Sequence, residues 1–352
     1  MTSNTRRRTV APLAAFLLLC GASAPAAWAY RYKTCNDNPQ TWSTDGRTYR
    51  RLRVSFPDGS DSASSLSRSG QSWGPYAPGW PFQINIAATD NTWWGEGNGY
   101  NDIAFTDDYG WSTDQLAVCI TYYKRCFFWA DEGGIRETDI LFRPNLGWNY
   151  TWNPTTADIN GPNPSFALVA MHELGHSLGL KHEDRWMATM NSYYPHSGPL
   201  GSRIPDAHAD DLNGARFLYG KHNDQRDVAA SNFLRTGSGS AGPIVPPKTA
   251  LRGQTITLPI TISNRGTQSE PSVLVTAKLG AFYPFGVNVA DLGSTVLDIN
   301  QGEWTIMMSM TIPTWVAPGY YILRACVDAS GSIYESDEAN NCATYSAFTY
   351  IK

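Results

Sequence analysis

The sequence has few charged residues, and it lacks both a basic stripe and a Gly-X-Y repeat. Charged residues make up 16% of the 352 residues, with 31 acidic against 27 basic. A nucleic-acid-binding protein would normally carry clustered Lys and Arg, so this class is excluded. The missing repeat excludes collagen. The apolar content of 42% excludes a disordered chain, and the length is sufficient for two domains that each bury a core.

Long hydrophobic runs are also absent, apart from a short one near the N-terminus. The arginines Arg6–Arg8 precede the mostly apolar residues 11–22, and residues 27–29 (Ala-Trp-Ala) follow with a small-x-small cleavage pattern. This arrangement predicts a signal peptide over residues 1–29, and therefore a secreted, extracellular protein without a membrane span. The alternative is an uncleaved N-terminal anchor. Residues 1–29 hold three Arg and no acidic residue, so 24 basic and 31 acidic residues remain, a net charge near −7.

Cysteines are few, and export would place them where disulfides persist. Five follow the predicted signal peptide, so at least one is unpaired or bonds outside the chain. Cys326 and Cys342 lie sixteen positions apart and far from the others, which predicts that they pair. Cys119 and Cys126 flank a six-residue run that is expected to turn back as a hairpin and bring them together. Cys35 is then left over.

The first part of the chain combines short extended runs with two helical patterns. Alternation predicts strands over 47–56, 81–87 and 135–142. A helix is predicted to start at the N-cap Ser165 and to run into residues 172–180, where Gly179 interrupts it, and a second helix to cover 207–219. The buried residues expected on the second helix are Leu212, Ala215, Phe217 and Leu218.

Three aspartates, Asp102, Asp107 and Asp108, follow a Gly-rich turn at 94–100. Carboxylate oxygens are the ligands that Ca²⁺ prefers, so calcium binding is one interpretation. Their spacing matches no known calcium loop, and solvated turn residues are the alternative.

The composition changes after Gly220. The remaining patterns predict strands only, separated by turn residues at a spacing typical of a β-sandwich; these strands cover 255–262, 272–278, 303–312, 320–327 and 343–350. The sequence therefore predicts one domain over 30–222 and another over 225–352. Alternatively, the Gly/Ser/Pro-rich residues 237–247 are the linker.

Three of the six histidines, His172, His176 and His182, lie within eleven residues. Helical residues four apart share a face, so the first two can bind one zinc ion. Glu173 lies beside them, where it can reach a metal-bound water. His182 can join only if the chain turns, and Gly179 permits a left-handed turn. Three protein ligands leave one position open for water, which is typical of a catalytic site; surface histidines on an amphipathic helix are the alternative.

This segment resembles the signature of the metzincin zinc proteases, HExxHxxGxxH. Metzincins also have a methionine in a tight turn beneath the metal, and Met190 stands where the matrixins place it. Residues 209–220 resemble the closing matrixin helix, and residues 137–142 resemble a strand of that fold. The resemblance implies an α+β catalytic domain, with a twisted sheet and a zinc-binding helix.

One residue departs from the matrixin pattern. Glu183 follows the third histidine, where matrixins usually have Ser or Thr. Astacins have Glu there, but their methionine comes later, and they carry a metal-reaching Tyr where this chain has Ser192. The matrixin resemblance also implies that Tyr194 walls the S1′ pocket, with a packed core aromatic as the alternative. The other histidines match no second zinc site, so surface or capping roles are predicted for His196, His208 and His222.

Residues 225–352 resemble a CARDB domain, an immunoglobulin-like sandwich of bacterial exported proteins. The resemblance depends on residues 262–267, 318–328 and 334–341. It implies an all-β domain that binds a surface or positions substrate. A passive stabilising domain is the alternative, because a sandwich fold does not define a function.

Taken together, these features predict a zinc-dependent endopeptidase that acts on extracellular proteins. Zinc-activated water would attack the peptide bond, with Glu173 as general base. The matrixin resemblance implies that an extended substrate adds to a sheet edge within 115–143. Every predicted catalytic group precedes residue 224, so the first domain is expected to work alone. The alternatives are a surface adhesion protein with a structural zinc site, which would not need Glu173, and a zinc hydrolase acting on a non-peptide substrate.

Overall fold

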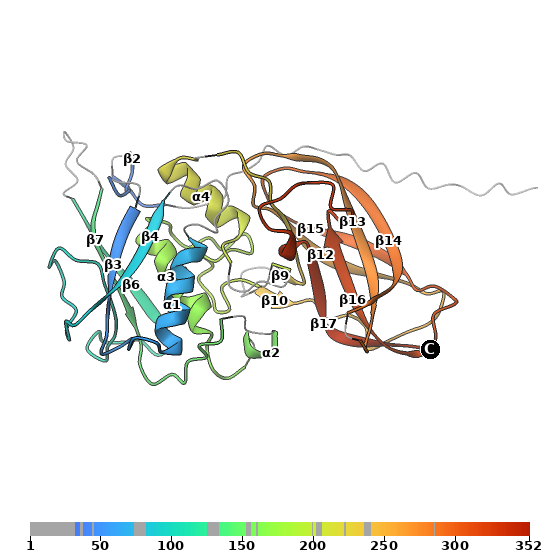
Figure 1. Cartoon of the computed structure of the whole chain (residues 1–352), viewed down its shortest axis with the longest axis horizontal. Coiled ribbons are helices and arrows are strands. Elements are labelled where there is room, and N and C mark those ends of the chain that lie inside the picture. Colours follow the sequence, from blue (N-terminus) through green and yellow to red (C-terminus); the bar gives the residue numbers. More distant parts are fainter. Residues whose placement is uncertain are drawn as a thin grey trace, which may run out of the picture.

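The computed structural model contains two separately packed cores (Figure 1). The structure describes residues 32–35, 38–43, 46–73, 82–124, 134–152, 156–159, 161–198, 200–201, 206–221, 223–235, 241–284 and 286–352. One core includes residues up to Tyr219, and the other begins at Val228. We refer to these parts as the first and the second domain. The predicted signal segment 1–29 lies outside the described residues.

The first domain is built on a five-stranded mixed sheet of order β4-β3-β5-β7-β6. Its strands are β3 (Gly46–Leu52), β4 (Gln83–Thr89), β5 (Asp102–Phe105), β6 (Ala117–Tyr123) and β7 (Ile135–Phe142). Strands β3, β4, β5 and β7 pair in parallel, whereas β6 is antiparallel to β7 and forms one edge. A small ribbon of β1 (Thr34–Cys35) and β2 (Asn38–Pro39) lies apart from this sheet. The three predicted strands correspond to β3, β4 and β7.

Three longer helices accompany this sheet: α1 (Asp61–Ser72), α3 (Phe166–Ser177) and α4 (Ala209–Tyr219), with a short α2 (Thr156–Ile159). The sequence analysis missed α1, because its Ser-rich residues show little apolar periodicity. Ser60 caps α1 by accepting a hydrogen bond from the Ala63 amide at 3.2 Å. The buried Trp73 then donates from its ring nitrogen to the Met171 carbonyl at 2.8 Å. This contact ties the end of α1 to the middle of α3.

The predicted burial of α4 is only partly correct. Leu212 and Ala215 are fully buried, and Leu218 is half-buried, but Phe217 is 52% exposed. The Phe217 ring stacks on Tyr32 with its centroid 5.1 Å away. Phe217 therefore packs against Tyr32 of the N-terminal segment instead of against the core. The helical pattern alone could not indicate this contact.

The acidic residues after the Gly-rich turn do not form a cluster. Asp102 is buried on β5, and one of its carboxylate oxygens lies 2.7 Å from Arg50 Nη2. Asp107 and Asp108 follow in the turn after β5. Among the described residues, no group with metal-ligand spacing includes these three aspartates. Asp102 stabilises the sheet through its ion pair with Arg50, and calcium binding by these residues stays a prediction.

A pH-dependent stability is expected from Asp139 on β7. Burial, with neighbouring carboxylates, raises the pKa of this group to about 7, and its Oδ2 atom has no hydrogen-bond partner among the described residues. The folded chain thus holds a proton that the unfolded chain releases near pH 4, so stability is lost as the pH rises through 7. We expect Asp139→Asn to raise the melting temperature at pH 8 by on the order of 5 °C and to change it little at pH 5. Equal shifts at both pH values, measured by thermal unfolding, would contradict this.

The predicted pairing of Cys119 with Cys126 is wrong. Cys119 is a free thiol on β6, and Cys126 lies outside the described residues. The run after Cys119 continues as extended strand to Tyr123, and each strand residue advances the chain by about 3.3 Å, so its described part moves away from Cys119 without turning back. Cys35, which the prediction left over, is disulfide-bonded. Cys326 and Cys342 form the predicted disulfide.

The second domain is all-β, and its two sheets enclose the second core. One sheet has the order β11-β17-β16-β13-β14 and the other β15-β12-β8. Their bounds are β8 (Val228–Ser231), β11 (Thr249–Ala250), β12 (Thr255–Asn264), β13 (Glu270–Ala281), β14 (Asn288–Ile299), β15 (Gly302–Thr311), β16 (Gly319–Val327) and β17 (Cys342–Ile351). A ribbon of β9 (Phe233–Arg235) and β10 (Ala241–Pro243) completes the domain. All five predicted strands correspond to members of these sheets.

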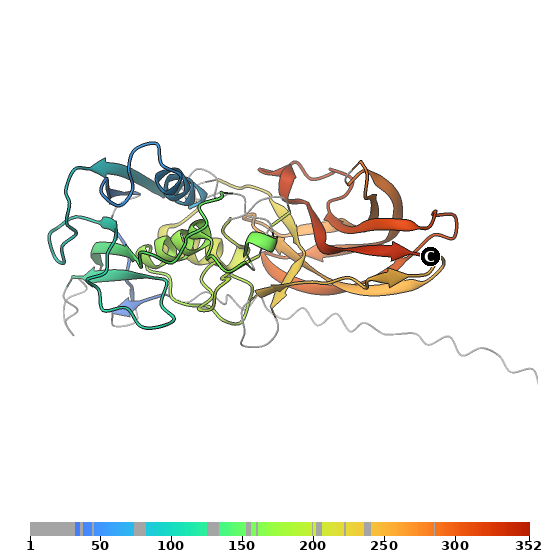
Figure 2. The same ribbon diagram turned by 90° about the horizontal axis from the view of Figure 1, so that it is seen from below.

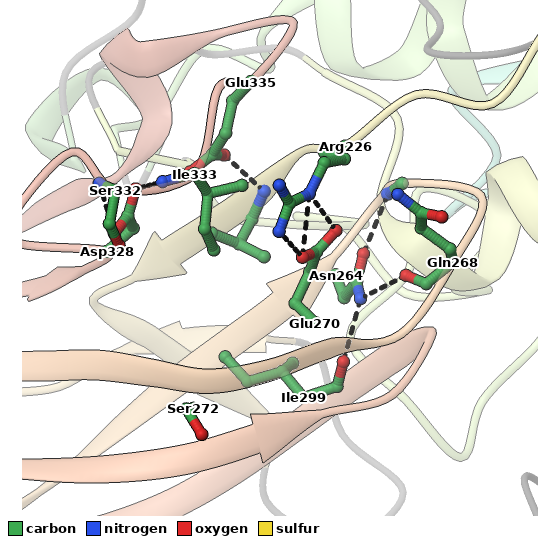
Figure 3. Close-up of polar contacts among 12 residues, drawn as sticks. Arg226, Asn264, Gln268, Glu270, Ser272, Ile299, Asp328, Ser332, Ile333 and Glu335 are labelled. Carbon is green, nitrogen blue, oxygen red and sulfur yellow. Dashed lines mark hydrogen bonds and ion pairs between the residues drawn. The ribbon is translucent and has the colours of Figure 1, made fainter.

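Polar contacts hold the loops at one end of this domain (Figure 3). Arg226 pairs with the buried carboxylate of Glu270, and the Val228 amide donates to Glu335 at 2.6 Å. Asp328 accepts from the amides of Ser332 and Ile333. Asp328, Glu335 and Glu338 have metal-ligand spacing, but these carboxylates already accept hydrogen bonds within the domain. We therefore regard this acidic group as part of the domain's framework.

The two domains lie side by side along the long axis of the molecule, with β9 and β10 near their boundary (Figures 1 and 2). Gly201 of the first domain donates its amide to the Ala230 carbonyl at 2.7 Å, and a Cβ there would lie 2.4 Å from Asn340 Cα. The fully buried Arg265 of the second domain donates to the Ala207 carbonyl and lies 3.0 Å from Asp206. The boundary is therefore a packed, polar interface.

Candidate metal centre and active site

Helix α3 and the turn after it carry the histidines. Ser165 is the N-cap of α3, although its side chain makes no capping hydrogen bond. The helix ends at Ser177, and Gly179 has φ 93°, in the left-handed region that favours glycine. A Cβ at Gly179 would also lie 2.7 Å from the Gln40 carbonyl oxygen. The chain reverses at this residue and brings His182 back towards the helix.

Three imidazole nitrogens converge at one point. His182 Nε2 lies 3.1 Å from His172 Nε2 and 3.0 Å from His176 Nε2. The Nδ1 atoms of His172 and His176 donate to the carbonyl oxygens of Thr189 (2.8 Å) and Leu180 (2.9 Å). Because Nδ1 carries the proton, each Nε2 presents its lone pair to the centre. Burial lowers the pKa of all three rings, which favours the neutral form that binds metal.

Glu173 lies beside this centre and is 5% exposed. Burial raises the pKa of its carboxyl to about 8, although a hydrogen bond from the Cys119 amide opposes the shift. Its Oε2 atom is buried and has no hydrogen-bond partner among the described residues. A buried carboxylate oxygen without a partner is costly to maintain, which indicates that it interacts with a group absent from the chain itself.

Met190 lies beneath the helix, and a Cβ on Gly175 would be only 2.2 Å from its sulfur. The carboxylate of Asp211 on α4 accepts the amides of Thr189 (2.7 Å) and Met190 (3.0 Å). Because the Thr189 carbonyl also accepts the proton of His172 Nδ1, this turn orients the His172 ring.

A cavity of about 590 Å³ opens onto the histidines and Glu173. Its walls come from α3, from the edge strand β6 with the residues before it, and from residues 192–196. Tyr194 lines this cavity, and its hydroxyl accepts the Ser165 amide at 2.8 Å and donates to the Ile159 carbonyl at 3.3 Å. The Cys119 thiol also lines the cavity, and burial raises its pKa, so it remains protonated.

His196 is a site residue that the sequence analysis missed. Its ring stacks on His172 with the centroids 3.9 Å apart, and it is only 7% exposed, so the predicted surface or capping role is wrong. Its Nδ1 donates to the Asn191 carbonyl at 2.7 Å. No sequence pattern indicated that His196 lies at this site, because the apolar residues of the segment 191–196 do not recur at a regular spacing. His208 does have a capping role, as the N-cap of α4, and His222 lies outside the described residues.

The donor set fits one zinc ion. Zinc in proteins is typically bound by neutral imidazole nitrogens, and three protein ligands with one open position are the catalytic arrangement. The three Nε2 atoms lie within 4.8 Å of one another and face a cavity. Glu173 is not among these ligands, but it lines the same cavity, and its unpartnered oxygen can accept a proton from a metal-bound water.

Within the described residues, we find no helix with the length and apolar character needed to cross a membrane.

Comparison with known proteins identifies two families along the chain. The Matrixin family matches residues 88–220, and the CARDB family matches residues 242–345. Human Matrix metalloproteinase-15 is 38% identical over 74 residues, which are 21% of this chain and 10% of that protein. Mouse Stromelysin-1 is 40% identical over 92 residues, 26% of this chain and 18% of that protein. The chain thus spans less than a fifth of the length of these relatives.

Among solved structures, the chain is similar to the CARDB domain of a Pyrococcus furiosus protein, a domain solved in complex with di-metal ions. The identity is 17% over 37% of this chain and 97% of that domain, with a TM-score of 0.26. Two parts of the chain thus match known families, Matrixin over residues 88–220, which include α4, and CARDB over residues 242–345.

Proposed function

We propose that this chain is a secreted, zinc-dependent endopeptidase that hydrolyses peptide bonds of extracellular proteins. The observation that carries the proposal is the convergence of three imidazole lone pairs beside the unpartnered oxygen of Glu173 in one open cavity. The match of residues 88–220 to the Matrixin family supports the metalloprotease class.

The residues divide the chemistry between binding and proton transfer. His172, His176 and His182 would hold the metal, which when bound supplies Lewis-acid activation of water and of the scissile carbonyl. Glu173 takes a proton from the attacking water at Oε2 and returns it to the leaving amine. The Cys119 amide orients the Glu173 carboxylate for this role.

The edge strand β6 is the proposed position of the substrate. Among the described strands it pairs with β7 on one side only, so its other side can accept a peptide that adds as a further strand. Residues before and within β6 line the cavity opposite α3. We infer that Tyr194 walls the pocket for the substrate side chain next to the cleaved bond.

A test of the function is cleavage of casein or gelatin by the purified chain, with and without a zinc chelator. Loss of cleavage on chelation and recovery on adding zinc would support the proposal. A chain that binds zinc but cleaves neither these proteins nor a library of unstructured peptides would favour the adhesion alternative.

Replacing His182 with Ala is expected to remove most of the zinc along with the activity, because two imidazoles alone bind zinc weakly. Zinc content after dialysis, measured by mass spectrometry of the metal, checks this. Lys181→Ala is the matched control, since its side chain is exposed and belongs to no metal-ligand group among the described residues. Full zinc occupancy in His182→Ala would show that the third ligand is another residue.

A further inference from the structure

We propose that the second domain is a structural part of the metal centre, and that Glu303 on β15 is a positioning residue for the metal ligands. This inference rests on the proposed function for the identity of the metal. It does not depend on which substrate the chain cleaves.

The element through which the second domain acts is the segment 183–192, which we call the return segment. It begins directly after His182 and includes the Met190 turn. The amide of Glu183 donates to the Met190 carbonyl at 2.8 Å, so the two ends of the return segment are joined. Thr189 within it accepts the His172 Nδ1 proton. Any displacement of this segment therefore moves two of the three ligands.

The second domain contacts the return segment directly. Met187 is buried in a small apolar cluster with Phe233 of β9 and Ala241 of β10. Arg235 donates to the Trp186 carbonyl at 3.2 Å and lies 3.8 Å from Asp184. The Met187 amide donates to the Glu303 carboxylate. The outer side of the return segment is thus packed on the second domain.

A second route runs from Glu303 through His208 at the start of α4. His208 is fully buried, and its ring nitrogens face Glu303 Oε2 at 2.8 Å and the Gly198 carbonyl at 3.1 Å. Both partners accept, so both nitrogens donate and the ring is an imidazolium. Glu303 favours the charged ring and raises its pKa, although burial opposes this.

The second route reaches the Met190 turn through Asp211. The amide of His208 donates to Asp211 Oδ2 at 3.1 Å, and the same carboxylate accepts the amides of Thr189 and Met190. His208 therefore sets the first turn of α4, from which Asp211 holds the Met190 turn. Removing the charge of Glu303 takes away the carboxylate that is paired with the buried His208 ring, which disturbs this arrangement.

The test compares Glu303→Gln with Glu270→Gln in the full chain. Glu270 is the matched control, because it is also a buried carboxylate of the second domain and forms an ion pair with Arg226 (Figure 3). Among the described contacts, Arg226 touches neither α4 nor the return segment. The readouts are Zn²⁺ affinity against a competing chelator and the visible absorption spectrum of the Co²⁺ form. Peptide cleavage adds a comparison of kcat with KM.

We expect Glu303→Gln to lower the Zn²⁺ affinity about tenfold and to change the Co²⁺ spectrum, with kcat falling more than KM changes. Glu270→Gln should leave all three readouts unchanged. A folded Glu303→Gln protein with parental Zn²⁺ affinity and an identical Co²⁺ spectrum would overturn the inference. If the parent protein binds zinc but cleaves no peptide, the proposed function is wrong. The Zn²⁺ affinities and Co²⁺ spectra of the variants then still test the role of Glu303.

A second variant covers the case in which Glu303→Gln does not fold. Arg235→Met keeps the aliphatic part of the side chain but removes the donor to the Trp186 carbonyl. We expect a smaller change of the Co²⁺ spectrum in the same direction. Identical spectra for this variant and the parent would also count against the inference.

Discussion

Replacing Glu173 with Gln is expected to reduce peptide cleavage by at least about a thousandfold, while the protein keeps its zinc. The glutamine has nearly the same size and can still accept the Cys119 amide, but it cannot take a proton from water. The unpartnered Oε2 atom is the acceptor that the reaction would use, and the substitution converts it into an amide nitrogen. A thousandfold loss corresponds to about 4 kcal/mol of lost transition-state stabilisation. The measurements are kcat on a fluorogenic peptide and the zinc content.

Glu137→Gln is the matched control for this experiment. Glu137 is another buried glutamate of the first domain, but it accepts the amides of Asn98 (3.2 Å) and Gly99 (2.6 Å) and does not line the cavity. We expect this variant to retain most of the activity. Substantial cleavage by zinc-loaded Glu173→Gln would mean that another group accepts the proton.

Removing the second domain is expected to inactivate the first. The sequence led to the opposite expectation, because every proposed catalytic group precedes residue 224. In the folded chain, however, Met187 packs against the second domain, and truncation would expose it. Truncation would also remove Glu303, the partner of His208, and the Gly266 carbonyl, to which the Arg216 guanidinium donates at 3.0 Å. We expect the fragment 30–224 to melt at least about 10 °C below the full chain and to lose zinc on dialysis.

Thermal unfolding, zinc content and kcat/KM on a short peptide check this second prediction. Adding residues 225–352 as a separate chain is an informative control, because partial recovery would locate the effect in the interface. A monomeric fragment with the melting temperature, zinc content and kcat/KM of the full chain would show that the two domains are independent.

The parts that were predictable from the sequence depend on short-range patterns. His172, His176 and Glu173 follow from the helical repeat, and Gly179 marks the turn because few other residues adopt its backbone conformation. The strands of the second domain follow from alternation. Helix α1 was missed because Ser and Gly carry no apolar signal. Cys119 was assigned to a hairpin because only six residues separate it from Cys126.

The sequence by itself determined which residues form the candidate metal centre, because these four residues lie within eleven positions and their geometry follows from one helix and one turn. Only the tertiary structure decided what surrounds them. His196 reaches His172 across 24 positions, and Glu303 reaches His208 across 95. Such contacts depend on how separate elements pack against one another. A polar residue that becomes buried in an interface has the same local sequence pattern as one that stays in solvent. The burial of Glu303, on which its proposed effect on the metal centre depends, therefore arises only in the folded chain.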